Sequence, residues 1–164
     1  MEKNNFIIKF SGIYENSSWV AERSVNIIKN FDDFENITNI MKNIVNQSSY
    51  EKKLELLNKH PDLALKKGEF SKLTKNSKNE QNKAGLNNLS LDEFKLFQTL
   101  NTKYKNKFNF PFILAVSGRN KDEIIDLFQQ RINNSYDEEF KEAINQVHKI
   151  AKIRINNFKI QEEN

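Results

Sequence analysis

Residues 135–158 of this 164-residue chain read SYDEEFKEAINQVHKIAKIRINNF. Ser135 and Glu138 have the spacing of a capping box, in which a short polar residue precedes Glu by three positions and starts a helix. After them, apolar residues recur at steps of three and four, which is the spacing of one helix face. These residues are Phe140, Ile144, Val147, Ala151 and Phe158. The segment therefore predicts a long amphipathic helix.

Similar signals occur in most of the chain. Apolar residues have helical spacing over residues 34–44, where Asp32 and Asp33 are possible caps, and over residues 50–57. Strand-like alternation is missing, because its best candidate, residues 6–10, is short and isolated. We therefore predict an all-α fold. Further helix starts of the capping-box type are Ser77…Glu80, Ser90…Glu93 and, in a weaker form, Asn120…Glu123.

Composition limits both the architecture and the chemistry. The length suits a single domain, and no repeat or linker divides the chain, so we predict one compact multi-helix domain over residues 1–164. Four glycines and two prolines are too few for a turn-rich β-sandwich or a glycine-rich nucleotide loop. The absence of cysteine excludes disulfides, a thiolate nucleophile and a cysteine-based zinc site. With only two histidines, a metal site would have to rely on carboxylates, and we expect none.

The charge of the chain does not indicate a nucleic-acid partner. The net charge is +4, but 22 of the 26 basic residues are lysine and 22 acidic residues interrupt them. The start of the chain lacks the layout of a signal peptide. Its longest apolar run, Phe110–Val116, is far too short to span a membrane. We expect a cytoplasmic protein that binds neither nucleic acid nor membrane.

The pair His60-Pro61 is a candidate site. Proline disfavours the helical conformation in the residue before it, so a helix that begins near Tyr50 should end at about His60. The negative end of the helix dipole would favour a protonated imidazole there, and histidine changes charge readily near neutral pH. A surface histidine that closes a helix is the alternative. The other histidine, His148, is interpreted as structural.

Arg154 falls on the apolar stripe of the last helix, three residues after Ala151 and four before Phe158. An unpaired guanidinium there would cost about 3–5 kcal/mol, so Arg154 needs an anion. A carboxylate of this chain would satisfy it, and a side chain that reaches back to solvent would avoid burial. A substrate carboxylate, which arginine can hold through two hydrogen bonds, is the functional alternative.

Two further segments allow both a structural and a functional interpretation. Ser77 to Gln81 can be a capping box, or a helix start whose N–H groups, together with the amide of Gln81, bind oxygens of a ligand. Residues 110–116 can be core, or the apolar wall of a small pocket whose backbone N–H and C=O groups meet the ligand.

Several motifs occur in an order and at spacings that resemble one known family, the 2-oxo-4-hydroxy-4-carboxy-5-ureidoimidazoline (OHCU) decarboxylases of urate degradation. The first motif, Gly12–Glu22 with the residue before it, differs from the usual residues of the family at Ser11, Asn16 and Ser18. These differences bear on the local geometry of the loop. The motifs are Gly12–Glu22, His60–Ala64, Ser77-x-x-Glu80-Gln81-x-x-Ala84-Gly85-Leu86, Leu100-Asn101-x-x-Tyr104, Phe108–Ile113, and Val147-His148-x-Ile150-Ala151-x-Ile153-Arg154-Ile155.

The resemblance implies a cofactor-free decarboxylation that gives (S)-allantoin and CO2, carried out by a homodimer. It implies that His60 donates a proton, that Glu80 pairs with His60 or with the substrate, and that Arg154 binds the anionic end of the substrate. The alternatives are a relative that acts on another ureido or imidazolone carboxylic acid, and a non-catalytic helical binding module. The implied substrate-binding residues are Pro61, Ser77, Lys78, Asn79, Gln81, Phe112, Ile113, Leu114, Ala115 and Val116.

Overall fold

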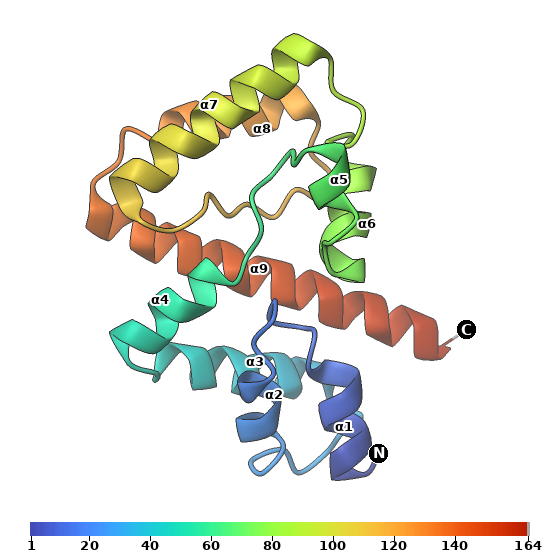
Figure 1. The fold of residues 1–164 in the computed structure, drawn as a ribbon. Helices are drawn as coiled ribbons and strands as arrows, with labels where there is room; N and C mark the ends of the chain where they lie inside the picture. The colour runs from blue at the N-terminus through green and yellow to red at the C-terminus, as the bar shows by residue number, and fades with distance from the viewer. Residues whose placement is uncertain (164) are drawn as a thin grey trace. The chain divides into compact units, whose positions relative to one another are not determined.

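The computed structural model describes the backbone of residues 1–163 and the side chains of residues 1–161. Within that range every regular element is an α-helix and none is a strand, which confirms the predicted all-α class for this part of the chain (Figure 1). None of these helices is long and apolar enough to span a membrane. The helices are α1 (Lys3–Phe10), α2 (Trp19–Ser24), α3 (Phe34–Asn46), α4 (Tyr50–Asn58), α5 (Lys67–Phe70), α6 (Lys75–Lys83), α7 (Leu91–Phe108), α8 (Lys121–Arg131) and α9 (Tyr136–Glu163).

The chain gathers into two compact units. Unit 1 contains Met1–Lys59 and the chain from Val147 onward, and unit 2 contains His60–Gln146. Helices α1 to α4 therefore belong to unit 1, α5 to α8 belong to unit 2, and α9 contributes to both. The single domain over residues 1–164 stays a prediction, and its last residue lies outside the described residues.

The segment that came nearest to a strand in the sequence is helix α1. Phe6 and Phe10 lie one helical turn apart, and their rings stack with centroids 4.3 Å apart. Phe10 also stacks on Phe158 of α9, with centroids 5.6 Å apart. Phe6 and Phe10 are both buried, so the four-residue spacing, rather than alternation, describes this segment.

Most of the predicted helix starts are confirmed. Ser90 and Asn120 each accept a hydrogen bond from the backbone of the Glu three residues later, and that Glu accepts one in return. Ser135 and Glu138 make the same two contacts, at 3.3 and 2.8 Å. Asp33 caps α3 by accepting from the N–H of Asn36. These side chains satisfy N–H groups that have no partner within the helix.

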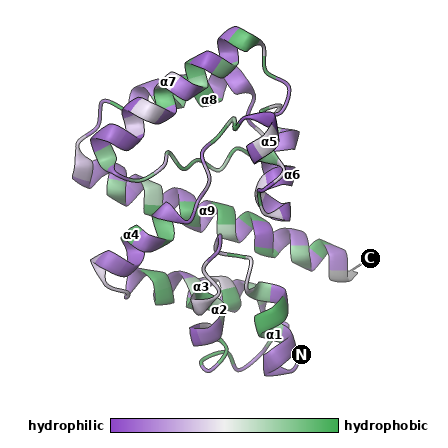
Figure 2. Ribbon diagram, viewed as in Figure 1, coloured by the Kyte–Doolittle hydropathy of each residue, from purple (hydrophilic) through white to green (hydrophobic). Residues whose placement is uncertain are grey.

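Aromatic side chains fill the core of unit 2. Phe112 stacks on Phe128 of α8 with ring centroids 3.8 Å apart, and Tyr104 of α7 meets Phe128 edge-on at 5.9 Å. Helices α7 and α8 lie side by side in Figure 1, and Phe97 joins them through its contact with Phe128. Hydrophobic and hydrophilic residues alternate along the long helices in Figure 2, as expected for helices with one buried face.

His148 lies in the core of unit 1 and makes contacts that suit a structural role. Its Nδ1 atom lies 2.8 Å from the Tyr14 hydroxyl, and its Nε2 atom lies 2.8 Å from Oδ1 of Asn46. Burial, together with the positive charges of Lys42 and Lys53, lowers the pKa of His148 to about 4. A neutral imidazole fits both contacts, since it accepts from the Tyr14 hydroxyl at Nδ1 and donates to Asn46 at Nε2.

This burial predicts a loss of stability in mild acid. The pKa of His148 falls from 6.5 to about 4 on folding, so between these values the unfolded chain binds a proton that the folded chain does not. The free energy of unfolding should therefore decrease by up to about 3 kcal/mol as the pH falls from 6.5 to 4. Urea unfolding followed by circular dichroism measures this decrease. A His148→Leu variant should show a smaller one, and equal decreases in both proteins would contradict the assignment.

Candidate functional site

His60 begins unit 2, directly after the end of helix α4. The helix ends at Asn58, with Lys59 as its cap, so the predicted termination near His60 is confirmed. His60 is only 8% exposed. It is therefore a buried histidine, and not the exposed cap that was the alternative interpretation.

Gln81 holds the backbone that follows His60-Pro61. Its side-chain Nε2 donates to the carbonyl oxygen of Asp62 at 3.0 Å, and its Oε1 accepts from the N–H of Ala64 at 3.0 Å. Gln81 is 2% exposed, so both ends of its amide bind the loop away from bulk water. The contact of Gln81 with a ligand stays a prediction, but its side chain already has this structural task.

The predicted capping box Ser77…Glu80 is wrong. Helix α6 begins three residues earlier, because Thr74 accepts a hydrogen bond from the N–H of Ser77 at 3.3 Å and is the true cap. Thr74 is as good a cap as Ser77, and the sequence alone did not decide between them. Ser77 and Glu80 both lie inside the helix, and Ser77 is buried. Capping is thereby excluded for Glu80.

The start of α6 also changes what residues 77–81 can offer to a ligand. The N–H of Ser77 binds the Thr74 hydroxyl, and the N–H of Lys78 binds the Thr74 carbonyl oxygen at 2.9 Å. The backbone of Asn79 and Glu80 lies within the helix. Side chains, rather than free helix-start N–H groups, are therefore what this stretch presents.

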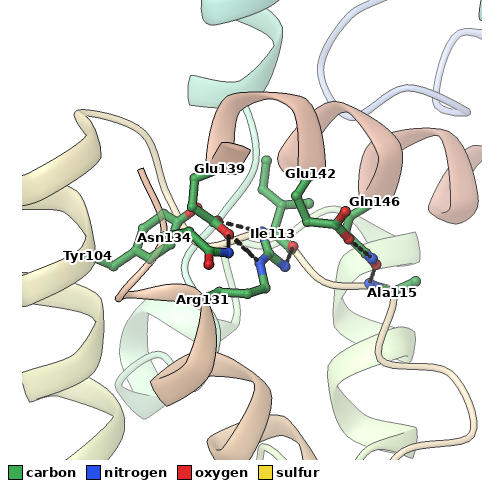
Figure 3. Close-up of polar contacts among 8 residues, drawn as sticks. All are labelled: Tyr104, Ile113, Ala115, Arg131, Asn134, Glu139, Glu142 and Gln146. Atoms are coloured by element: carbon green, nitrogen blue, oxygen red, sulfur yellow. Dashed lines mark hydrogen bonds and ion pairs between the residues drawn. The ribbon is translucent and has the colours of Figure 1, made fainter. Parts of the chain in front are cut away.

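The predicted wall, residues 112–116, is irregular backbone held by a buried ion pair. Arg131 of α8 donates to both carboxylate oxygens of Glu139 on α9, at 3.0–3.2 Å. Through Nη1 it also donates to the carbonyl oxygen of Ile113 at 2.7 Å (Figure 3). The guanidinium lies 4.4 Å from the centre of the Phe112 ring. Arg131 is 7% exposed and Glu139 is fully buried.

Two neighbours complete the partners of Glu139. The Tyr104 hydroxyl donates to Oε2 of Glu139, and Nδ2 of Asn134 donates to Oε1 at 3.0 Å (Figure 3). Burial, and secondly the hydrogen bond to Glu139, raises the pKa of the Tyr104 hydroxyl, which keeps it protonated as a donor. The buried carboxylate is thus surrounded by donors, as a charge removed from water requires.

A second side chain holds the same segment from α9. Oε1 of Gln146 accepts from the N–H of Ala115 at 3.0 Å, and its Nε2 donates to Glu142 at 2.7 Å (Figure 3). The C=O of Ile113 and the N–H of Ala115 are therefore each hydrogen-bonded to a side chain of the protein. In residues 1–163, neither the N–H nor the C=O of Leu114 makes a hydrogen bond with the protein, and the contact of Leu114 with a ligand stays a prediction.

Arg154 is buried in unit 1 and has a carboxylate partner there. It is 4% exposed, and its Nη2 donates to Glu15 at 2.8 Å, while Nη1 donates to the carbonyl oxygen of Gly12 at 3.0 Å. Arg154 therefore pairs with a carboxylate of this chain, which was the structural alternative in the sequence analysis. Glu15 lies among the positions that depart from the family motif, Ser11, Asn16 and Ser18. A substrate contact of Arg154 stays a prediction.

The structure brings most of the predicted residues into one unit. His60, Pro61, Ser77 to Gln81 and Phe112 to Val116 all belong to unit 2, whereas Arg154 belongs to unit 1. Among the described residues, no group of three or more histidine, aspartate or glutamate side chains could hold a metal ion. The absence of a metal or cofactor from the reaction stays a prediction.

The sequence analysis missed Glu139 and Arg131. A signal for Glu139 existed, because Glu139, Ala143, Gln146 and Ile150 continue at helical spacing to Arg154. The argument that singled out Arg154 as a charge on a buried face applies equally to Glu139. A similar signal marks Arg131, which follows Ile124 and Phe128 at steps of four and three, although its partner lies on another helix.

A model of the OHCU decarboxylase family matches residues 1–156 of this chain. The chain belongs to this family. It is 38% identical over 155 residues to the 2-oxo-4-hydroxy-4-carboxy-5-ureidoimidazoline decarboxylase of Haloferax volcanii. The aligned region covers 94% of this chain and 89% of the relative. The match extends over all of the motifs that carried the resemblance.

Solved structures of similar proteins agree with the family assignment. A crystal structure of (S)-allantoin synthase superposes with a TM-score of 0.73 at 32% identity, over 96% of this chain and 50% of that one. This chain thus spans half the length of that protein. A crystal structure of OHCU decarboxylase in the presence of (S)-allantoin has a TM-score of 0.71 at 21% identity, over 92% and 96% of the two chains, and shows the same fold.

The buried pair of Arg154 and Glu15 predicts an asymmetric effect of mutation on stability. Arg154→Met should lower the free energy of unfolding by about 3–5 kcal/mol, because it leaves the Glu15 carboxylate buried without its charged partner. Replacing both residues in Arg154→Met/Glu15→Leu should restore much of that loss. Urea unfolding measures both values. A single variant within about 1 kcal/mol of wild type would contradict a buried, structurally required pair.

Proposed function

We propose that this protein is an OHCU decarboxylase, a carboxy-lyase that converts OHCU to (S)-allantoin and CO2 in the last step of urate conversion to allantoin. Family membership over residues 1–156 carries the proposal. The name of the Haloferax volcanii relative, and its 38% identity over nearly the whole chain, support the same substrate. The buried His60 supports the same chemistry, because a proton donor is what the reaction needs.

The reaction requires little more than positioning and one proton. The bond between C4 and the carboxylate breaks, CO2 leaves, and the electron pair passes from C4 into the ring C=N bond at C5, whose nitrogen takes up a proton, so that an enol with a C4=C5 double bond forms. The C4 hydroxyl then loses its proton and becomes a carbonyl while a proton adds to one face of C5, and the direction of this addition decides the handedness of allantoin. The substrate is its own electron sink, so the proposal requires no cofactor.

In this proposal His60 donates the proton to C5. Its burial excludes bulk water, a competing donor that would protonate either face. Glu80, which lies inside α6 and not at its cap, would pair with His60 or with a donor of the substrate. Arg154 would bind the anionic end of the substrate, as the resemblance implies.

The wall of residues 112–116 would orient the ring and ureido groups. Within the described part of the chain, Leu114 has both a backbone N–H and a C=O without a hydrogen bond to the protein. A ureide presents an N–H beside a C=O, so it can complement both groups at once. Pro61 and the side chains of Ser77, Lys78, Asn79 and Gln81 would border the same ligand.

Two other functions use the same scaffold. A different ureido or imidazolone carboxylic acid could be the substrate, or the chain could bind a ligand without turning it over.

We also propose that the protein acts as a cytoplasmic homodimer, as the family resemblance implies. Light scattering at working concentration measures the mass of the assembly, and a value near the 19.3 kDa of one chain would contradict the dimer.

A coupled assay separates these functions. Urate is passed through uricase and hydroxyisourate hydrolase, the protein is added, and optical activity at the allantoin stage is recorded. The proposed enzyme gives fast formation of one enantiomer, whereas spontaneous decay gives a racemate. A racemate formed at the uncatalysed rate contradicts the activity.

Removal of the proton donor should abolish most of the rate and preserve the fold. His60→Ala should lower kcat by about 10²–10⁴-fold, the usual contribution of general acid catalysis. Helical circular dichroism should not change. His148→Ala is the matched control, since it removes the other histidine from the core of unit 1 and should keep kcat when assayed below its unfolding temperature. A nearly normal kcat in His60→Ala would contradict the proposed role.

Loosening the wall should affect binding more than turnover. Arg131→Lys keeps the charge but cannot hold Glu139 and the Ile113 carbonyl at once, because lysine lacks the planar fork of arginine. We expect KM to rise by about tenfold, equal to about 1.4 kcal/mol of binding, with a smaller change in kcat. Arg23→Lys, on the surface of unit 1, is the control. An unchanged KM would show that the wall does not contact the substrate.

A further inference from the structure

We propose that Gln98 and Asn101 of helix α7 are positioning residues that, with Gln81, aim His60 at the substrate. We call these three residues the amide clamp. The proposal rests on the proposed function, because it assigns to the clamp the direction of proton transfer. It goes beyond the residues implied by the resemblance, among which only Gln81 occurs, and there as a ligand contact.

The clamp holds the backbone that directly follows His60-Pro61. Asn101 donates through Nδ2 to the carbonyl oxygen of Leu63 at 2.9 Å, and Gln98 donates through Nε2 to the carbonyl oxygen of Ala64 at 2.9 Å. Gln81 holds the residues on either side of Leu63 through the two hydrogen bonds described above. Four backbone groups in three consecutive residues are thus bound by side-chain amides.

This loop needs such support. Leu63 is 7% exposed and Ala64 is fully buried, so their backbone groups must find partners within the protein. Ala64 adopts φ of +59°, a left-handed conformation that is unfavourable for a residue with a side chain. A conformation of this kind persists only where the surroundings hold it. The loop lies outside any helix, so the clamp supplies that hold.

Helix α7 presents the clamp from one face. Gln98, Asn101 and Lys105 follow each other at steps of three and four, so they point to the same side. Lys105 adds an ion pair with Asp62, at 2.5 Å. One rigid helix therefore contacts three consecutive residues of the loop, Asp62, Leu63 and Ala64.

Asn101 is otherwise difficult to explain. It is 4% exposed, and within the described part of the chain its Oδ1 atom has no hydrogen-bond partner. A buried acceptor without a partner destabilises a protein, and an apolar side chain of similar size would avoid that. The contact of Nδ2 with Leu63 is what asparagine provides there. We infer that this contact contributes more to the position of the loop, and so of His60, than to the stability of the core.

A proton donor must be aimed within a fraction of an ångström, and a displacement of about 1 Å can lower a rate by about 10²-fold. His60 is joined to the clamped loop through Pro61 alone, so movement of the loop displaces the imidazole. Such a displacement should reduce kcat and relax the choice of face at C5. In variants of Gln98 and Asn101 it should leave KM almost unchanged, because these two side chains bind the backbone of the loop and are not among the proposed ligand contacts.

The test uses near-isosteric variants that remove only the amide, Gln98→Met and Asn101→Leu. Each should lower kcat by about 10- to 100-fold, keep KM within about twofold, and reduce the enantiomeric excess of allantoin. Thr99→Ala is the surface control on the same helix, because its hydroxyl binds only the Lys95 carbonyl oxygen of its own helix. It should match wild type in kcat, KM and enantiomeric excess.

Phe97→Leu is the control for stability. It opens a cavity in the same helix against Phe128 and removes no hydrogen bond to the loop. If the clamp acts only through stability, Phe97→Leu should lower kcat and enantiomeric excess as much as a clamp variant of equal melting temperature. That result, or a normal kcat with normal enantiomeric excess in both clamp variants, would overturn the proposal.

Hydrogen exchange separates failure of the clamp from failure of the proposed function. If the wild-type protein produces no allantoin, the function is wrong, and the clamp is tested by the exchange of the Ala64 amide proton, which Gln81 binds. This proton should exchange at least about tenfold faster in Gln98→Met and Asn101→Leu than in Thr99→Ala. Equal exchange rates would show that the loop does not depend on the clamp.

Discussion

The buried ion pair of Arg131 and Glu139 is the interaction on which the predicted wall depends. Glu139 is fully buried and Arg131 nearly so, and a charge removed from water is tolerated only when donors or acceptors surround it. The pair therefore has one favourable arrangement, which also joins α8 to the start of α9. The remaining donor of Arg131 fixes the carbonyl oxygen of Ile113. An irregular segment is thus held by side chains instead of by the hydrogen bonds of a helix.

The same constraint acts at two other places. The loop after His60 has no secondary structure, and side-chain amides such as that of Gln81 satisfy its buried backbone. In unit 1, Arg154 satisfies the carbonyl oxygen of Gly12 and the carboxylate of Glu15. The buried polar side chains at these places therefore hold irregular backbone.

The helices were predictable because their signals are local. Capping boxes and apolar stripes involve residues within one or two turns, so the starts at Ser90, Asn120 and Ser135 are confirmed. Ser77 failed because Thr74, three residues before it, competes as a cap. Pairs between helices have no such signal. Arg154 was correctly placed on a buried face, but its partner lies 139 residues away in the sequence.

The central claim is that His60 meets the ligand and His148 does not. The chain contains only these two histidines, so a ¹⁵N spectrum of histidine-labelled protein reports on both imidazoles without other signals. On titration with the product (S)-allantoin, the account predicts that the His60 ring nitrogens shift with saturation and that those of His148 stay in place. (R)-Allantoin should bind more weakly. A spectrum in which His60 does not respond, or only His148 does, would contradict the account.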